Sequence, residues 1–249
     1  MSKDKKTKND ISWEDIFLKY DILNCIRTLG AFNISSEQIN EFREARLMTK
    51  FDYRRSLPAI FKKNKLSILP VTRGKYVISH FDAYQSLENT AEITRMVFPD
   101  YIQSLNYENI TSEAIAINCA YLSGMLENFV DDQQLLPTVN GRMSSGSFSF
   151  KIRNTATDTV VNVSVENSQI EIDAGYEGVN FLTLVEAKNS ISDDFLIRQM
   201  YYPFCLWSSK VSKKVKLVFM VYTNGIFHLY EYEFVGTKGA EIDKELSIL

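Results

Sequence analysis

The sequence predicts an α/β (α+β) protein in which helices dominate the first third and an α/β sandwich with a mixed central sheet follows. Three observations favour this fold class. Apolar residues recur at helical spacing between Trp13 and Gly30. The run over residues 181–188 is apolar and partly β-branched, as expected of a strand. Asn224-Gly225 separates two further apolar runs and is the strongest short-range signal for a β-hairpin.

The first third of the chain is expected to contain three helices and a hairpin. The first helix spans residues 13–30 and ends at a glycine. The second begins at the N-cap residues Ser35-Ser36 and runs toward residue 48, and a short third helix covers 53–64, with Pro58 near its start. Two short strands, 66–70 and 76–79, flank a turn at 72–75. Three helices followed by a hairpin are typical of a winged-helix domain, so we assign residues 12–80 to a winged-helix-like DNA-binding domain.

The charge of the chain is distributed unevenly. Residues 1–80 contain 16 Lys and Arg against 9 Asp and Glu, whereas the remainder contains 12 against 22. A basic part joined to an acidic part suggests an anionic partner. A winged-helix domain places one helix in the major groove of double-stranded DNA and its wing on the phosphate backbone. We therefore expect DNA to be bound by Arg54 and Arg55 on the recognition helix and by Arg73 and Lys75 on the wing. The alternative is a basic but purely structural region.

The rest of the chain, residues 81–249, is expected to form a second domain. It begins with a connector over 81–110 that has helical character around 88–96. A long helix runs from Ser112 to Asp131-Asp132, and residues 140–147 form a flexible loop. Ser192-Asp193-Asp194 has the character of an N-cap for a helix over 195–208. The expected strands cover residues 148–153, 160–165, 169–173, 181–188, 215–222 and 226–234.

Two of these strands end in residues that suggest chemistry. Asp173 ends one strand, and Glu186 and Lys188 end the next. Because side chains alternate along a strand, Glu186 and Lys188 point to one face and Ala187 to the other. The pair is therefore either a surface ion pair at a fraying strand end or part of a site.

This set of residues, followed by a helix, resembles the PD-(D/E)XK nuclease superfamily. Asp173 matches the first acid of its motif, Glu186 the second acid and Lys188 the lysine. The stretches 186–203 and 42–52 look more narrowly like type II restriction endonucleases. Two positions depart from the pattern: Ile172 stands where a proline often precedes the first acid, and Pro203 stands four residues after Gln199, where some related nucleases have tyrosine.

The resemblance implies a restriction-endonuclease-like domain over residues 81–249 that hydrolyses phosphodiester bonds of double-stranded DNA with Mg²⁺. Mg²⁺ prefers oxygen ligands and acidifies bound water, so the metal ligands are expected to be Asp173, Glu186 and the carbonyl of Ala187. Lys188 is expected to orient or deprotonate the attacking water. The other candidate site residues are Gln199 as a partner of Lys188 or phosphate, Glu127 as a helix-borne acid and Glu171 as a reserve ligand.

Two alternatives to a site-specific restriction endonuclease stay open. One is a winged-helix DNA-binding regulator whose nuclease-like domain is inactive, and the other is a DNA repair or junction nuclease. A homodimer is expected, because cleavage of a palindromic duplex matches a two-fold symmetric protein.

The polar start lacks the apolar segment of a secretory signal, and no apolar run approaches the roughly 20 residues that span a bilayer. Cys25, Cys119 and Cys205 are expected to be buried free thiols, so we expect a cytoplasmic protein without contact to a membrane.

Overall fold

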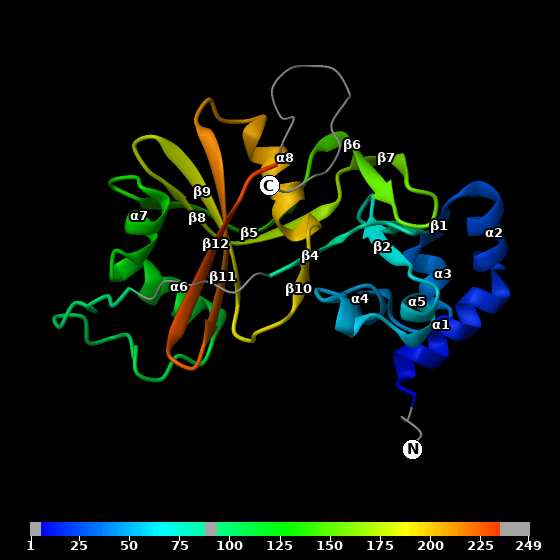
Figure 1. Ribbon diagram of the computed structural model, residues 1–249, viewed down its shortest axis with the longest axis horizontal. Helices are drawn as coiled ribbons and strands as arrows, with labels where there is room; N and C mark the ends of the chain where they lie inside the picture. Colours follow the sequence, from blue (N-terminus) through cyan, green and yellow to red (C-terminus); the bar gives the residue numbers. More distant parts are fainter. Residues whose placement is uncertain (1–5, 88–93, 235–249) are drawn as a thin grey trace.

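The computed structural model describes residues 6–87 and 94–234. It confirms the α/β class: helices flank a five-stranded mixed sheet, and a smaller three-stranded sheet accompanies the N-terminal helices (Figure 1). The N-terminal helices lie on one side of the molecule and the large sheet on the other. Between them lie helix α8 (Arg198–Ser208) and the hairpin of β6 (Ser147–Asn154) and β7 (Thr159–Glu166).

The expected first helix is divided into α1 (Lys8–Lys19) and α2 (Ile22–Leu29). The break falls at Asp21, whose φ of 47° is left-handed and interrupts the helix. Gly30 ends α2 as predicted, with φ 82° at the C-cap. Ser35 caps α3 (Ser36–Asn40) through a capping box with Gln38, but α3 is short, and α4 (Ala45–Met48) forms separately.

The prediction of a third helix over residues 53–64 is also wrong in detail. Residues 54–56 form the 3₁₀ turn η1 (Arg54–Ser56), and only α5 (Ala59–Lys63) is helical, because Pro58 stands between the two. The predicted hairpin is present as β2 (Ser67–Pro70) and β3 (Lys75–Ser79). Strand β1 (Phe32–Ser35), which the sequence did not indicate, pairs with β3 and gives the antiparallel order β1-β3-β2.

The large sheet has the strand order β12-β11-β9-β8-β5. Its only parallel pair joins β9 and β11, and its other described pairs are antiparallel. Residues 140–144, predicted to be a loop, lie in β5, because that strand absorbs Gly141 at φ 83° through register shifts. Asn224-Gly225 makes the predicted turn, with φ 50° and 76°. The strand bounds are β5 (Leu136–Ser144), β8 (Gln169–Glu177), β9 (Phe181–Lys188), β11 (Lys214–Thr223) and β12 (Ile226–Tyr232).

Helices cover both faces of this sheet. Leu182 and Leu184 of β9 belong to the cluster that also contains Met200 of α8. The alternate residues Val185 and Ala187 pack with α6 (Glu113–Leu122) and α7 (Met125–Val130). The predicted single helix is broken between α6 and α7 by Gly124, whose φ is 73°. Glu186 and Lys188, which alternate with Val185 and Ala187, therefore face α8.

The residues before α8 form a strand and not the predicted helix cap. Strand β10 (Asp194–Leu196) pairs with β4 (Tyr84–Ser86), and α8 begins at Arg198 without a side-chain cap. Pairing with a strand more than 100 residues earlier in the chain has overridden the local N-cap signal. The helical character predicted around residues 88–96 falls largely on residues 88–93, which lie outside the described residues.

The two parts of the chain share one hydrophobic core. A single cluster of buried residues runs from Trp13 and Ile34 to Phe195 and Phe234. The buried Tyr202 hydroxyl donates a hydrogen bond to the Pro70 carbonyl at 3.0 Å, so α8 is tied directly to the hairpin of the N-terminal part.

None of the described helices is long and apolar enough to cross a membrane. Of the three cysteines Cys119 is buried, whereas Cys25 and Cys205 are half-buried, and no disulfide joins them.

A buried carboxylate organises the turn before β9. Asp132 is 5% exposed and accepts hydrogen bonds from the backbone amides of Gln133, Asn180 and Phe181 at 2.9, 3.1 and 2.9 Å. Burial would raise the pKa of Asp132, but these amide donors outweigh burial and lower the pKa. A Cβ on Gly178 would lie 2.2 Å from the Asp132 carboxylate, so only glycine fits beside it.

We expect Asp132→Ala to lower the free energy of unfolding by about 3 kcal/mol at pH 7, because buried amides lose a charged acceptor. Since the folded-state pKa of Asp132 is lowered, its contribution is present above the unfolded pKa of about 3.9 and is lost as the pH falls through the folded-state pKa. Denaturant unfolding at pH 7 and pH 3 measures both effects. Asp15→Ala, at an exposed position of α1, is the control. Equal losses in the two variants would contradict the structural role of Asp132.

Candidate active site

Asp173 lies at an irregularity of β8. Gly141 of β5 is opposite Ile172, and Val139 is opposite Gly175, so β8 carries an extra residue between these two pairs. Such a β-bulge changes the direction of the side chains that follow it. The β8–β9 ladder ends at the pair Ala174 and Val185. Beyond that pair the Asp173 carboxylate accepts a hydrogen bond from the Ala187 amide at 2.9 Å, so the side chain takes the place of the missing strand partner.

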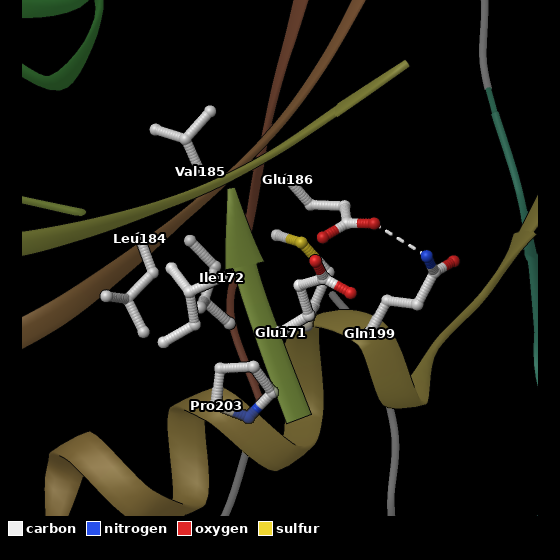
Figure 2. A pocket seen from close by; sticks show the side chains of 9 residues that line it. Glu171, Ile172, Leu184, Val185, Glu186, Gln199 and Pro203 are labelled. Atoms are coloured by element: carbon white, nitrogen blue, oxygen red, sulfur yellow. Dashed lines mark hydrogen bonds between the residues drawn. The ribbon is translucent and has the colours of Figure 1, made fainter. Parts of the chain in front are cut away.

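Glu186 and Lys188 lie beside Asp173 at the end of β9, as the sequence predicted. Lys188 Nζ and Gln199 Nε2 both donate to Glu186 Oε1, at 2.5 and 2.6 Å. The Glu186 and Lys188 side chains are only 9% and 11% exposed, so the pair is not a surface ion pair at a fraying strand end. Figure 2 shows Gln199 reaching from α8 toward the Glu186 carboxylate, with Glu171 below it.

The two charges of this pair influence each other strongly. Burial raises the pKa of Glu186 to about 8; Lys188 opposes this shift, and the carboxylates of Asp173 and Asp52 add to it. Burial alone would lower the pKa of Lys188, but the adjacent Glu186 carboxylate outweighs burial and raises it. Lys188 is therefore an ammonium group at neutral pH in the metal-free protein.

The structure adds one carboxylate that the sequence did not indicate. Glu113 is the first residue of α6, immediately after its N-cap Ser112. Burial raises the pKa of Glu113, Lys188 opposes the shift and Asp173 adds to it, which places the Glu113 carboxylate within the electrostatic reach of both groups. The sequence showed Glu113 only as an acid in the first turn of a predicted helix. Acids are common at that position because they interact favourably with the helix dipole, so Glu113 did not stand out as a site residue.

The two other candidate acids have different surroundings. Glu127 of α7 accepts a hydrogen bond from the Leu135 amide at 3.1 Å and so holds the chain after that helix. Glu171 lines a small cavity together with Glu186, Gln199 and Pro203, but its side chain is 51% exposed and pairs with Arg142 at 3.2 Å. The helix-borne acid that the structure brings near Lys188 is thus Glu113. Asp173, Glu186 and Lys188 form a cluster, and Glu171 lies next to this cluster but forms its ion pair with Arg142.

The Gln199 side chain has one acceptor that its neighbours do not satisfy. Its Oε1 is buried without a hydrogen-bond partner among the described residues. Pro203 lies inside α8 and has no N–H to bond the carbonyl four residues earlier, which is that of Gln199. The start of α8 thus presents the acceptor oxygen of the Gln199 side chain next to the Glu186 carboxylate. Among the described residues, no group of three or more His, Cys, Asp or Glu side chains is arranged to hold a metal ion.

The four basic residues expected to bind DNA are exposed, but two of them are not placed as predicted. Arg54 and Arg55 lie on the 3₁₀ turn η1 and not on a recognition helix. The Arg54 amide donates to Asp194 at 2.9 Å, and its guanidinium lies 3.4 Å from the same carboxylate. Arg73 lies in the turn between β2 and β3, and Lys75 is the first residue of β3, as predicted.

Two family models match the chain. Residues 79–243 match a domain of unknown function, DUF6997, and residues 10–78 match a second domain of unknown function, DUF6996. Because the first match covers more than half of the chain, the chain belongs to the DUF6997 family. No curated protein and no solved structure matches it.

The raised pKa of Glu186 makes the stability of the metal-free protein depend on pH. A raised folded-state pKa gives a stabilising contribution that is complete below the unfolded pKa of about 4.3 and is lost as the pH rises toward the folded-state value of about 8. Glu186→Gln removes this titration. We expect the stability of Glu186→Gln relative to wild type to rise between pH 5 and pH 8, by on the order of 1 kcal/mol.

Denaturant unfolding in EDTA at both pH values measures this change. The matched control is Glu171→Gln, whose carboxylate is half exposed and should show little pH-dependent difference from wild type. A relative stability of Glu186→Gln that does not change with pH would mean that Glu186 is ionised throughout this range.

Proposed function

We propose that the chain is a Mg²⁺-dependent nuclease that hydrolyses phosphodiester bonds of double-stranded DNA, of the type II restriction endonuclease kind. The observation that carries this proposal is the arrangement at the ends of β8 and β9. There a bulge and a diverging strand pair bring Asp173 to the Ala187 amide, next to the buried Glu186–Lys188 pair. An acid on one strand, and an acid and a lysine two residues apart on the next, is the pattern on which the sequence resemblance rests.

The charge of the cluster favours a cation. Lys188 stands against the carboxylates of Asp173, Asp52 and Glu113 as well as that of Glu186. A divalent cation would stabilise the ionised form of Glu186 and so oppose the burial that raises its pKa. Mg²⁺ keeps several of its waters and needs few protein ligands, so two carboxylates can hold it where no group of three is preformed among the described residues.

Ala187 can supply a third oxygen. The amide and the carbonyl of one residue in a strand point toward the same neighbouring strand. Since the Ala187 amide bonds Asp173, its carbonyl also points toward the β8 side, beyond the last paired residues of that ladder. Asp173, Glu186 and the Ala187 carbonyl are therefore the proposed ligands.

The remaining groups orient the reaction. When bound, Mg²⁺ would lower the pKa of a water ligand and screen the charge of the scissile phosphate. Lys188, an ammonium group at neutral pH, is suited to hold the attacking water or a phosphate oxygen. Gln199 fixes the Glu186 carboxylate through its Nε2. Glu113 lies near enough to Lys188 to help keep its charge.

The N-terminal part is proposed to dock on DNA through its exposed basic residues. Helices followed by an antiparallel hairpin support a winged-helix-like module, and Arg73 and Lys75 lie on the wing. Sequence-specific recognition and a homodimer that cuts both strands complete the proposal.

A second candidate function is a DNA-binding regulator with an inactive nuclease-like part. It is favoured by the contacts of Glu186, because Lys188 and Gln199 both occupy Oε1 and compete with a metal for the carboxylate. Incubation of plasmid DNA with the protein and Mg²⁺ separates the two functions. Discrete fragments support the restriction enzyme, and intact plasmid together with a retarded duplex supports the regulator.

Asp173→Ala and Glu186→Ala are expected to abolish cleavage in Mg²⁺ and to leave duplex binding in Ca²⁺ within a few-fold of wild type. Both residues are assigned to the metal, and neither is assigned to reading bases. Cleavage rates and gel-shift titrations on one substrate measure the two effects, with Glu127→Ala as a carboxylate control away from the strand ends. Cutting by either variant at the wild-type rate would remove that residue from the site.

Arg73→Ala and Lys75→Ala are expected to weaken duplex binding equally for all sequences. Each lost phosphate contact should reduce the slope of log K against log[salt] by about 0.9. Titrations at several salt concentrations measure the slope, and Lys8→Ala, at the exposed start of α1, serves as the basic control. An unchanged slope in both variants would show that the wing does not contact the DNA backbone.

A further inference from the structure

A segment of the N-terminal part, residues 51–55, is fixed to the two short strands β4 and β10, the second of which follows β9 in the chain. The Phe51 carbonyl accepts a hydrogen bond from the Tyr84 hydroxyl at 2.9 Å, and the Asp52 carbonyl accepts one from the Leu196 amide at 2.8 Å. Arg54 is bound to Asp194 through its amide at 2.9 Å. These contacts hold the segment against β4 and β10. Strand β10 lies in the chain between the end of β9, which carries Glu186 and Lys188, and the start of α8, which carries Gln199.

Two side chains of this segment lie within the electrostatic reach of the cluster. The Asp52 carboxylate adds to the raised pKa of both Glu186 and Glu113. Tyr53 is half-buried, and its hydroxyl interacts with the side chain of Ser190, two residues after Lys188. Burial raises the pKa of Tyr53, and Ser190 and Lys188 oppose that shift. At neutral pH Tyr53 is therefore a neutral phenol, a hydrogen-bond donor beside the ammonium group of Lys188.

Basic groups continue outward from Tyr53. The Arg55 guanidinium lies over the Tyr53 ring at 5.1 Å, and Lys62 of α5 donates to the Arg55 carbonyl at 2.5 Å. The Arg55 side chain is exposed. Arg54, in contrast, is paired with Asp194. Moving outward from the cluster, the protein thus presents a neutral donor and then positive charge, which suits successive phosphates of one nucleic-acid strand.

We propose that Tyr53 and Arg55 form one wall of the active site, where Tyr53 donates a hydrogen bond to the phosphate held at the Asp173–Glu186–Lys188 cluster and Arg55 binds the next phosphate of the same DNA strand. This assignment rests on the proposed nuclease function. It differs from the prediction of a recognition helix, because Arg55 binds the strand that is cut and reads no base. The active site is composite, with one wall supplied by the N-terminal part.

Tyr53→Phe and Arg55→Ala in the full chain test the proposal. The controls are Tyr101→Phe, at a side chain that is 78% exposed, and Arg27→Ala on the exposed side of α2. Single-turnover cleavage of a duplex in Mg²⁺ gives the rate of the chemical step, and titration of the same duplex without divalent cations gives affinity independently of catalysis. Thermal unfolding verifies that each variant is folded.

Tyr53→Phe is expected to slow the chemical step about 10- to 100-fold, the range for one hydrogen bond to a charged group, with duplex affinity unchanged. Arg55→Ala is expected to weaken duplex affinity several-fold for cognate and unrelated sequences alike. A folded Tyr53→Phe that cuts as fast as Tyr101→Phe overturns the role of Tyr53, and loss of affinity for the cognate sequence alone overturns the role of Arg55. If wild type itself does not cut, the proposed function fails before the variants are compared.

Discussion

The candidate site depends on one hydrogen bond, from the Ala187 amide to the Asp173 carboxylate at the point where β8 and β9 separate. A regular ladder would satisfy the Ala187 amide with a backbone carbonyl and would leave no space between the strands. The extra residue in β8 ends the ladder at Ala174 and Val185. The Asp173 side chain then supplies the acceptor, which fixes the carboxylate against β9 and leaves its second oxygen for other partners. A local defect in the sheet thus lets the half-buried Asp173 carboxylate stand between two strand ends.

Burial gives this cluster its chemical character. Glu186 and Lys188 lie under α8, where water is largely excluded, so each charge depends on the other and on the surrounding carboxylates. Separating such a pair leaves a buried, unpaired charge, which is strongly destabilising. Burial is the main cause of the raised pKa of Glu186, and the neighbouring carboxylates of Asp173 and Asp52 add to it, so the ionised carboxylate is costly without a cation. A structural ion pair would instead be expected to balance its charges.

The elements that the sequence predicted best are those in which a local pattern and the tertiary structure agree. The expected strand over 181–188 coincides with β9, because its residues are buried on both faces, and Ser35 and Ser112 begin helices as N-caps. The errors fall where long-range pairing decides. Ser192-Asp193-Asp194 has the pattern of a helix N-cap, but residues 194–196 pair with residues 84–86 and form a strand. Glu113 and Asp52 lie at least 60 residues before the cluster they join, and no local spacing could indicate that.

The continuous core explains why the N-terminal part can contribute to the site at all. Strand β7 donates from its Glu166 amide to the Val71 carbonyl at 2.8 Å, and His80 accepts from the Thr155 amide, also at 2.8 Å. With α8 bound to Pro70, the β2–β3 hairpin is held from two sides by the other part of the chain. A hairpin held in this way cannot swing independently of the cluster. DNA bound on the β2–β3 hairpin would therefore meet the cluster in one orientation. The distance between the bound hairpin and the scissile phosphate would be set by the packed core and not by a flexible linker.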